Sequence, residues 1–404
     1  MTKYSLFFFI VILIQGTAYA DSTLVKKIDD LEVSIKHKYA PDKRTALFES
    51  TTDLVQQSIY VETTEKEALY EFKRSLTEEN ILLHVNSNLL PAADLNGKIY
   101  AVANLSVSNN RSVPGHSSEL ATQMLLGTPV EVLKKDRDYY LIRTPDKYLS
   151  WTDPGGIRLM DEKEFKLWKS SEKIVFTQDF GYSYKTSAET ATRVSDLVKG
   201  NILKLIGKEG AFYKVAYPDN RIAFIPIKNA ENFKKWVKRP NPSAQQILNS
   251  AKSMIGIPYL WGGTSTKGVD CSGFTKTSFF LNGIILPRDA SQQALIGQSV
   301  DILDADTVSL EKSLKNLQPG DLLFFAAGTN AKRPNARVTH TAIYIGNGEF
   351  IQAAGLVRIN SMLPGSLNYD DFQTRTLVSA RRMLTVIGNP EITKVENHPW
   401  YISN

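Results

Sequence analysis

The chain has 404 residues, of which 42% are hydrophobic and 22% are charged, and its formal net charge is +6. This is the composition of an ordinary globular protein with room for two to four domains. The mild basic excess favours an anionic partner, although a solvated surface that happens to be basic explains it equally well. We expect no nucleic-acid partner, because the chain has neither a basic cluster nor a recognisable binding motif.

Residues 1–20 are predicted to be a secretory signal peptide. Lys3 gives a short positive start, Leu6 to Ile14 is an unbroken apolar run, and Ala18-Tyr19-Ala20 is a small-x-small cleavage site. The run is too short to span a bilayer comfortably, and no later stretch approaches spanning length. We therefore expect cleavage after Ala20, a secreted or periplasmic location, and no membrane span in the mature chain.

Residues 21–97 are predicted to be a polar, helical region without chemistry of its own. Within it, Phe72 and Leu76 lie at helical spacing, and Thr64 with Glu67 resembles a capping box. We expect this region to pack on the domains C-terminal to it.

Residues 98–165 and 170–238 are predicted to be two copies of one small β unit. The members of four residue pairs lie 73 positions apart (200 − 127 = 73): Gly127 and Gly200, Tyr140 and Tyr213, Pro145 and Pro218, and Trp151 and Phe224. A constant offset over this many positions implies an internal repeat. Short alternating strands with Pro-Asp turns suggest small barrels, and the pattern resembles bacterial SH3-like modules.

Residues 243–390 are predicted to be an α+β domain, reached through a charged, proline-bearing connection at 230–242. Ser243 can cap its first helix, and a second helix is expected at 271–282. Strands are expected after the second helix, at 322–325, 338–345, 349–353 and 377–382. A helix packed on an antiparallel sheet is an α+β arrangement.

Cys271 is the only cysteine of the chain, so it cannot form an internal disulfide. It stands where the second helix begins, and there the helix dipole and the free N–H groups favour thiolate over thiol. This makes Cys271 a candidate nucleophile. The alternative is a small buried hydrophobe, which is the commonest role of a lone cysteine. The preceding Asp270 and the nearby Gly262, Gly263 and Gly273 favour the nucleophile.

A cysteine nucleophile needs a base, and the chain has only five histidines. His340 alone lies on a predicted strand of the domain that holds Cys271. The other four lie in the N-terminal region, in a turn of the first barrel and in the C-terminal tail: His37, His84, His116 and His398. The alternative for His340 is a core histidine whose hydrogen bonds are satisfied.

Strand parity then suggests which group orients His340. A two-residue Asn347-Gly348 loop would pair Ile343 with Gln352 and put His340 and Gln352 on opposite faces. A three-residue loop would pair Ala342 with Gln352 and put both side chains on one face. If Gln352 orients His340, the connection must therefore have an odd count or contain a bulge.

Five motifs in this order resemble the NlpC/P60 family of papain-like cysteine peptidases of the bacterial cell wall. They are Tyr259-x-Trp261-Gly262-Gly263, Asp270-Cys271-Ser272-Gly273, Leu286-Pro287-Arg288, Pro319-Gly320-Asp321-Leu322, and the pair His340 with Gln352. The resemblance covers roughly residues 243–385. With the two SH3-like units upstream, the chain is similar to the γ-D-glutamyl-L-diamino acid endopeptidases of the YkfC type.

The resemblance implies a role for each matched residue. Cys271 matches the nucleophile and His340 the base, while the third position, usually histidine, is Gln352 here. A glutamine carbonyl oxygen can accept the hydrogen bond that orients an imidazole. Tyr259 matches a tyrosine beside the oxyanion, and the backbone N–H of Cys271 would be the second donor.

The resemblance also implies residues that line the substrate site. Asp270 fills the position of an acid that helps to hold a substrate ammonium, and Trp261, Ser272 and Ser291 match other lining positions. The first barrel is expected to close the site with an acid and a tyrosine, for which Glu119 and Tyr148 are candidates. Glu119 could equally be a solvated turn residue, and Tyr148 could equally pack inside the barrel.

The function implied is hydrolysis of the γ-D-glutamyl–diamino acid bond in peptidoglycan stem peptides that have a free N-terminal L-alanine, by a monomer that needs no cofactor and no metal. A non-catalytic wall-binding protein and an amidase or acyltransferase on the same fold are the alternatives.

Overall fold

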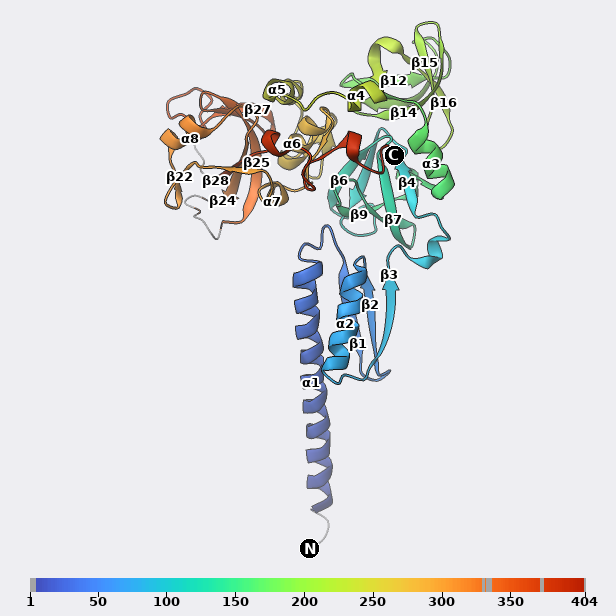
Figure 1. Cartoon of the computed structure of the whole chain (residues 1–404), viewed down its shortest axis with the longest axis vertical. Coiled ribbons are helices and arrows are strands. Elements are labelled where there is room, and N and C mark those ends of the chain that lie inside the picture. Colours follow the sequence, from blue (N-terminus) through green and yellow to red (C-terminus); the bar gives the residue numbers. More distant parts are fainter. Residues whose placement is uncertain (1–4, 329–330, 332–335, 371–373, 403–404) are drawn as a thin grey trace. The chain divides into compact units, whose positions relative to one another are not determined.

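The computed structural model describes residues 5–328, 331, 336–370 and 374–402, with side chains from Ser22 onward. The chain divides into two compact units, Met1–Asn96 and Gly97–Asn404. Figure 1 shows the first unit in blue and the second from cyan to red. Within the described residues, no helix combines the length and the hydropathy required to cross a membrane.

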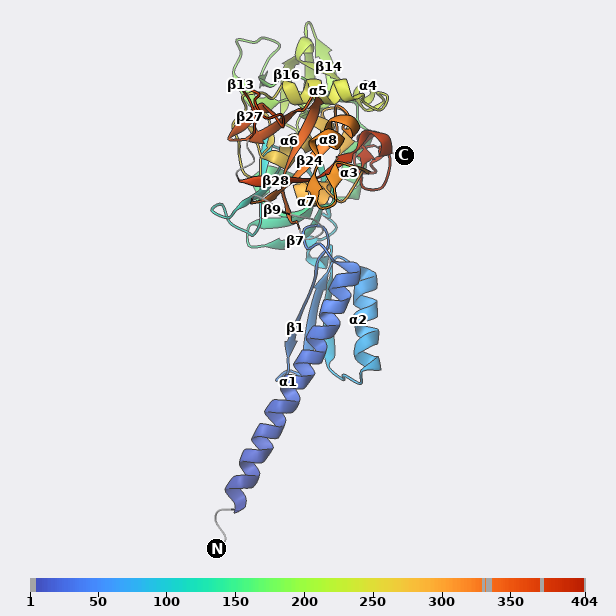
Figure 2. The same cartoon turned by 90° about the vertical axis from the view of Figure 1, so that its left-hand side faces the viewer.

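The first unit is a small three-stranded sheet covered by two helices. Its elements are α1 (Ser5–Tyr39), β1 (Phe48–Asp53), β2 (Ser58–Thr63), α2 (Lys66–Glu78) and β3 (His84–Leu89). The central strand β2 pairs antiparallel with β1 and parallel with β3. Both helices pack against the sheet through Ile28, Ile59, Val61 and Phe72, and Figure 2 shows them side by side.

The prediction of a helical N-terminal region is therefore wrong for residues 48–63 and 84–89, which form strands. Ile59 and Val61 are buried while Tyr60 between them is exposed, an alternation typical of a strand with one covered face. The expected capping box is also absent. Thr64 lies outside α2 and its hydroxyl accepts a hydrogen bond from the N–H of Leu47 at 2.9 Å. The predicted signal peptide falls on the first part of α1 and stays a prediction.

The second unit begins with two barrels of seven strands each. The first contains β4 (Tyr100–Ala103), β5 (Val107–Arg111), β6 (Leu120–Leu125), β7 (Pro129–Asp136), β8 (Tyr139–Arg143), β9 (Leu149–Thr152) and β10 (Ile157–Met160). The second contains β11 (Lys173–Phe176), β12 (Phe180–Tyr184), β13 (Arg193–Val198), β14 (Ile202–Glu209), β15 (Phe212–Ala216), β16 (Ile222–Pro226) and β17 (Ala230–Asn232). Helices α3 (Glu162–Ser170) and α4 (Phe233–Val237) follow the two barrels.

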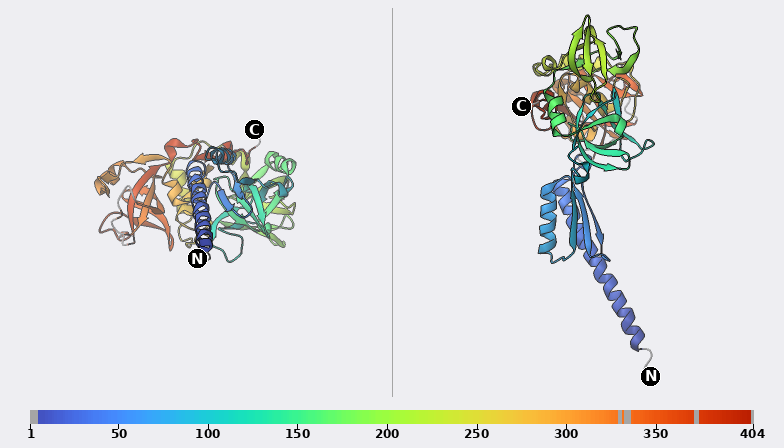
Figure 3. Two further views of the ribbon diagram at one scale, coloured as in Figure 1. Left: turned by 90° about the horizontal axis from the view of Figure 1, so that it is seen from below. Right: turned by 90° about the vertical axis from the view of Figure 1, so that its right-hand side faces the viewer.

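The internal repeat is confirmed strand by strand. Each strand of the second barrel begins 73 residues after its counterpart, from β4 and β11 (173 − 100 = 73) to β10 and β17 (230 − 157 = 73). The order of neighbouring strands is also the same, β10-β4-β7-β8-β9-β5-β6 in the first barrel and β17-β11-β14-β15-β16-β12-β13 in the second. Figure 3 shows the two barrels in cyan-green and yellow-green.

The catalytic candidate residues lie in the α+β region C-terminal to the barrels. Its helices are α5 (Ala244–Lys252), α6 (Cys271–Phe280), α7 (Ala290–Gln293) and α8 (Leu310–Asn316). Its main sheet has the order β21-β28-β24-β25-β26-β27, formed by β21 (Gln298–Val300), β28 (Arg375–Arg382), β24 (Leu322–Ala327), β25 (Val338–Gly346), β26 (Glu349–Ala354) and β27 (Leu356–Ser361). Three short hairpins or bridges complete it: β18 (Thr264–Ser265) with β19 (Gly268–Val269), β22 (Leu303–Asp304) with β23 (Thr307–Val308), and β20 (Ile284–Ile285) with β29 (Thr393–Lys394). Helix α6 packs on β25 and β26, and Phe274, Phe324, Ile343 and Ile351 are buried in the shared core.

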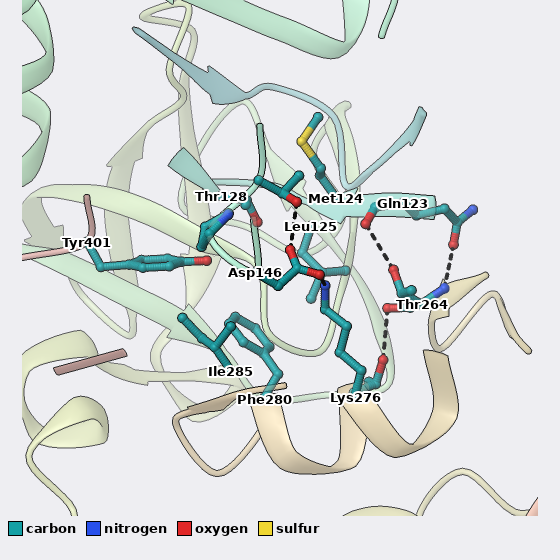
Figure 4. A pocket seen from close by; sticks show the side chains of 13 residues that line it. Gln123, Met124, Leu125, Thr128, Asp146, Thr264, Lys276, Phe280, Ile285 and Tyr401 are labelled. Carbon is teal, nitrogen blue, oxygen red and sulfur yellow. Dashed lines mark hydrogen bonds and ion pairs between the residues drawn. The ribbon is translucent and has the colours of Figure 1, made fainter. Parts of the chain in front are cut away.

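The first barrel is attached to this α+β region by polar contacts that are themselves buried. The side-chain oxygen of Gln123 in β6 accepts from the backbone N–H of Thr264 at 3.0 Å. Asp146 forms an ion pair with Lys276 of α6 beside a small cavity, shown in Figure 4. Burial alone would raise the pKa of Asp146, but the charge and hydrogen bond of Lys276 outweigh it and the pKa is lowered. Asp146 is therefore a buried charge with its partner in place.

The two barrels meet where Gly127 faces Ile202. A Cβ on Gly127 would lie 2.2 Å from the carbonyl oxygen of Ile202, and its φ is +84°. Gly210 also has a positive φ, +55°, but it faces open space.

We expect Gly127→Ala to cost about 1–2 kcal/mol for the left-handed backbone and a further ~1–3 kcal/mol for overpacking. Gly210→Ala incurs only the first cost, so thermal unfolding should show a clearly larger shift for Gly127→Ala, and equal shifts would contradict this account of the joint.

Candidate active site

The hairpin of β25 and β26 places His340 and Gln352 on one face of the sheet. Ile343 pairs with Ile351, and continuing this register by one residue brings Ala342 opposite Gln352. The loop is Asn347-Gly348, with both residues at positive φ, and the register shift lies between Tyr344 and Gly346. The expected pairing is thus reached through a bulge rather than a three-residue loop, because the extra residue restores the parity that a two-residue turn would break.

The imidazole of His340 is held by Gln352, with 2.7 Å between its Nε2 and Oε1 of the amide. The amide nitrogen of the buried Gln352 donates to Oδ1 of Asn360 at 2.8 Å and to Oδ2 of Asp370 at 3.0 Å. A carboxylate can only accept, so the amide must present its oxygen to His340. It follows that Nε2 of His340 carries the proton, and Nδ1 is left as a hydrogen-bond acceptor.

Cys271 is the first residue of α6, and the side chain of Asp270 caps that helix by accepting from the N–H of Gly273 at 2.7 Å. The sulfur lies against β25, where the backbone of Thr341, the neighbour of His340, forms a hydrogen bond with it. The structure therefore brings Cys271 to the strand that carries His340, as predicted from the sequence.

The protonation states differ from the sequence prediction. Burial, and next the charge of Asp270, raise the pKa of Cys271 to about 11, despite the hydrogen bonds from Thr341 and Ser272. Burial, and next the charge of Arg375, lower the pKa of His340 to about 4. The expected thiolate at the helix N-terminus is thus wrong for this state, because desolvation outweighs the helix dipole. At neutral pH the pair is an uncharged thiol and an uncharged imidazole.

Tyr259 is half-buried, and its phenol lies near enough to Cys271 and Asp270 to interact electrostatically with both. Burial raises the pKa of its phenol, and a negative charge on Cys271 or Asp270 raises it further. The phenol therefore keeps its proton over the physiological range and remains a hydrogen-bond donor.

Asp270 and Arg288 form a buried ion pair beside Cys271, and the side chain of Arg288 is only 1% exposed. The guanidinium reaches both carboxylate oxygens, at 3.1 Å and 2.6 Å. Its other contacts are the hydroxyl of Ser272 at 3.0 Å and that of Thr122 in β6 at 2.9 Å. Burial opposes the charge on Arg288, but Asp270 raises its pKa, so the arginine stays protonated.

The ion pair occupies the hydrogen-bonding capacity of two predicted substrate-binding residues. Oδ2 of Asp270 also accepts from the N–H of Gly262 at 2.9 Å, and Oδ1 accepts from the hydroxyl of Ser272 at 3.3 Å. With the helix cap and Arg288, the carboxylate has no lone pair left for a ligand. Asp270 and Ser272 are thus placed at the site but are engaged in holding α6. The motif Leu286-Pro287-Arg288 contains Arg288 but does not by itself give the arginine a role, although an arginine after the apolar run Ile284-Ile285-Leu286 is a signal for a buried, paired charge.

The first barrel reaches the same motif through Glu119. Its Oε1 accepts from the indole N–H of Trp261 at 2.7 Å, and Trp261 is 61% exposed. Glycine is required at position 262, since a Cβ there would lie 2.3 Å from the carbonyl oxygen of Leu120. The structure therefore brings Glu119 and Trp261 together at the edge of the Cys271 motif, and Glu119 is not a free turn residue.

For the remaining candidate residues, Tyr148 and Ser291, burial and the neighbouring elements define the position. Tyr148 is buried, and its phenol lies near enough to Arg288 to affect the pKa of the guanidinium. Ser291 is half-buried on α7, which packs on β25. Outside the site, the ring of His116 packs edge-on against Tyr139, and His398 interacts with the carbonyl of Pro145. These two rings are thus engaged in contacts within the first barrel and between the C-terminal segment and that barrel.

The neutral thiol predicts how fast Cys271 reacts with iodoacetamide. Alkylation proceeds through the thiolate, so between pH 7 and 9 the rate constant should rise about tenfold per unit without a plateau. Mass spectrometry reports Cys271 alone, because the chain has no other cysteine. The unfolded chain is the control, since its thiol has a pKa of about 8.5 and reacts faster at pH 7. A rate that stays constant from pH 6 to 8 would instead mean a thiolate–imidazolium pair.

The Arg288–Asp270 pair predicts a double-variant result. Arg288→Met leaves a buried carboxylate unpaired and should destabilise the second unit by about 3–5 kcal/mol. Adding Asp270→Asn removes that charge and keeps a residue that can cap α6, so it should recover much of the loss. Differential scanning calorimetry of the two variants checks this. If the double variant melts no higher than Arg288→Met, the destabilisation does not arise from an unpaired carboxylate.

Comparison with known proteins identifies both parts of this arrangement. The NlpC/P60 family matches residues 256–378, and the bacterial SH3 domain matches residues 106–155. A Bacillus cereus protein named γ-D-glutamyl-L-lysine dipeptidyl-peptidase is 28% identical over 257 residues, covering 62% of this chain and 72% of its own. An Escherichia coli K12 protein named murein DD-endopeptidase MepS/murein LD-carboxypeptidase is 31% identical over 141 residues, covering 35% of this chain and 63% of its own.

A solved structure shares the fold. The crystal structure of a NlpC/P60 family protein from Bacillus cereus superposes with a TM-score of 0.57 at 24% identity, covering 70% of this chain and 99% of that one. The SH3 match falls on the barrel that supplies Glu119, and the NlpC/P60 match contains Cys271, His340 and Gln352. Residues 256–378 are therefore an NlpC/P60 cysteine peptidase domain, preceded in the chain by a bacterial SH3 domain.

Proposed function

We propose that the protein hydrolyses the bond between a γ-D-glutamyl residue and a diamino acid in peptidoglycan stem peptides. One observation carries this proposal. Gln352 orients the imidazole of His340, and His340 lies on β25, the strand against which α6 with its first residue Cys271 packs. The name of the Bacillus cereus relative supports the bond, and the name of the Escherichia coli relative supports the polymer.

In the proposed mechanism Cys271 is the nucleophile and His340 the general base. The two resting groups are neutral, so proton transfer to Nδ1 of His340 accompanies attack of the sulfur on the γ-glutamyl carbonyl. The resulting imidazolium then protonates the leaving amine. Water, deprotonated by His340, attacks the thioester carbonyl, and the released thiol recovers its proton. Gln352 keeps the imidazole in the required tautomer throughout.

The oxyanion of each tetrahedral intermediate would be bound by two donors. One is the backbone N–H of Cys271, which lies at the start of α6 where N–H groups have no partner within the helix. The other is the hydroxyl of Tyr259, whose raised pKa keeps it a donor while charge develops beside it. Donors placed for the developing charge commonly contribute ~10²–10³ in rate.

We assign recognition of a free N-terminal L-alanine chiefly to Glu119. Oε1 of Glu119 is held by Trp261, and Oε2 makes no hydrogen bond with any residue in the described part of the chain. A charged amine leaving water needs a compensating charge, which this carboxylate supplies. Asp270 contributes only through the electrostatic attraction of its negative charge for the amine, because Arg288 and the helix cap already occupy its oxygens. Trp261, Ser272, Ser291 and Tyr148 complete the proposed lining.

We also propose that the enzyme acts outside the cytoplasm, after cleavage following Ala20. The apolar run and small-x-small site at the N-terminus support export. Peptidoglycan as the substrate fits the same location.

The test uses L-Ala-γ-D-Glu-L-Lys with product detection by mass spectrometry. The wild type should release L-lysine, and Cys271→Ala should reduce the rate at least ~10³-fold because the nucleophile is gone. Turnover by Cys271→Ala would contradict the mechanism. If the wild type turns over no muropeptide at all, the protein is the non-catalytic wall-binding alternative.

A second arm tests recognition of the amine. Acetylation of the alanine nitrogen should slow the wild type at least tenfold, because Glu119 then faces an uncharged group. Glu119→Gln should lose most of this discrimination while it retains the hydrogen bond to Trp261. Equal rates for the two substrates in the wild type would remove the role of Glu119 and leave the hydrolase intact.

A further inference from the structure

The proposed reaction fixes the direction in which a stem peptide lies across the site. Glu119, held by Trp261, takes the amine at the L-alanine end. At the other end His340 protonates the nitrogen of the diamino acid as it leaves, so the diamino acid lies beyond the scissile bond, close to β25. Its α-carboxylate is attached to the same carbon as that nitrogen. A group that binds this carboxylate has to come from β25 or from the strands beside it.

Arg358 of β27 stands beside the catalytic strands. It pairs directly with Gln352 of β26, and both side chains lie on the face of the sheet that carries His340. Neighbouring strands are ~4.8 Å apart, so β27 lies about 10 Å from β25, a distance that a long arginine side chain can largely span. The start of β27 also lies next to Tyr259, whose backbone N–H donates to the carbonyl of Gly355 at 2.8 Å.

The guanidinium of Arg358 is held in place but is not neutralised. Its Nε donates to Oδ1 of Asn360 at 3.1 Å, the same oxygen that accepts from the amide of Gln352. In the part of the chain that the structure describes, the exposed Arg358 forms no ion pair, and its two terminal nitrogens make no hydrogen bond. The nearby Arg375 differs, because it is paired with Asp370. Arg358 therefore offers two N–H donors in the fork that matches a carboxylate.

We propose that Arg358 binds the α-carboxylate of the diamino acid that leaves. This assignment rests on the proposed function, which sets the direction of the substrate, and it adds a specificity-determining residue to the same site. A contact at the carboxylate also fixes the leaving nitrogen relative to His340, because both groups are attached to one carbon. A stem that continues beyond the diamino acid has an uncharged amide at this point. Such stems are expected to bind more weakly than stems that end there.

The test measures peptide binding to the Cys271→Ala chain by isothermal titration calorimetry, so that no ligand is cut. The ligands are L-Ala-γ-D-Glu-L-Lys and the same peptide with a C-terminal carboxamide. The Cys271→Ala parent should bind the free carboxylate at least fivefold more tightly. Adding Arg358→Met should remove this preference, and Arg358→Lys, which keeps the charge but loses the fork, should retain part of it.

Two outcomes would overturn the proposal. One is a parent that binds the two peptides equally. The other is an Arg358→Met chain that still prefers the carboxylate, even if it binds both peptides more weakly, because Arg358 would then only support Asn360 and Gln352. Lys315→Met is the matched control, since it removes one exposed positive charge from α8, which reaches β28 through Asn316 and lies away from β27 in the sheet order. It should keep the preference of its parent.

A further ligand identifies which carboxylate is bound, because the D-glutamyl residue also carries one. Converting that carboxylate to a carboxamide should weaken the parent and the Arg358→Met chain by the same factor. A penalty that disappears with Arg358→Met would place Arg358 at the D-glutamyl residue and overturn the assignment. Turnover of L-Ala-γ-D-Glu-L-Lys by the wild type is measured separately, so failure of the proposed hydrolysis is distinguishable from failure of this contact.

Discussion

The ion pair between Arg288 and Asp270 is the constraint on which the rest of the site depends. Asp270 caps α6 and so places Cys271, while Arg288 extends the same network to Thr122 of the first barrel. Two charges removed from water are costly unless every remaining donor and acceptor is paired. A displacement of the barrel would leave the Nε–H of Arg288 unpaired in a buried position. The barrel, the nucleophile helix and the Trp261 motif therefore hold one common arrangement.

Desolvation also sets the protonation state of the catalytic pair. Burial raises the pKa of Cys271 and lowers that of His340, so the resting pair is neutral. A neutral orienter suits a neutral imidazole. A carboxylate in the place of Gln352 would raise the pKa of His340 and favour an imidazolium before substrate arrives. The charged members of this network lie beyond Gln352, as seen from His340. Asp370 accepts a hydrogen bond from the Gln352 amide and is itself paired with Arg375 at 2.5 Å. These two charges oppose each other, so the network fixes the tautomer with little net charge at the ring.

Much of this arrangement can be predicted from local sequence patterns. The offset of 73 residues carries over to all seven strands of the barrels because a repeat preserves both strand length and turn position. Parity relates His340 to Gln352, but whether a bulge or a longer loop supplies the extra residue depends on the backbone at Gly346. The strands of the first unit are harder to predict, because β1 and β3 are largely polar and read as helix or loop. The thiolate prediction is wrong because burial of Cys271 depends on the packing of α6 against β25, which no local pattern reports.

The uncharged state of Cys271 also bears on its chemical lifetime. Peroxides and disulfides oxidise a thiolate far faster than a thiol, so a thiol whose pKa is raised to about 11 is a poor substrate for both. A reactive cysteine usually becomes sulfenic acid in proportion to its thiolate fraction. Here the thiolate forms only while His340 removes the proton during attack. The same burial that keeps the resting pair neutral therefore protects the sulfur between turnovers, without a second cysteine or a reducing partner.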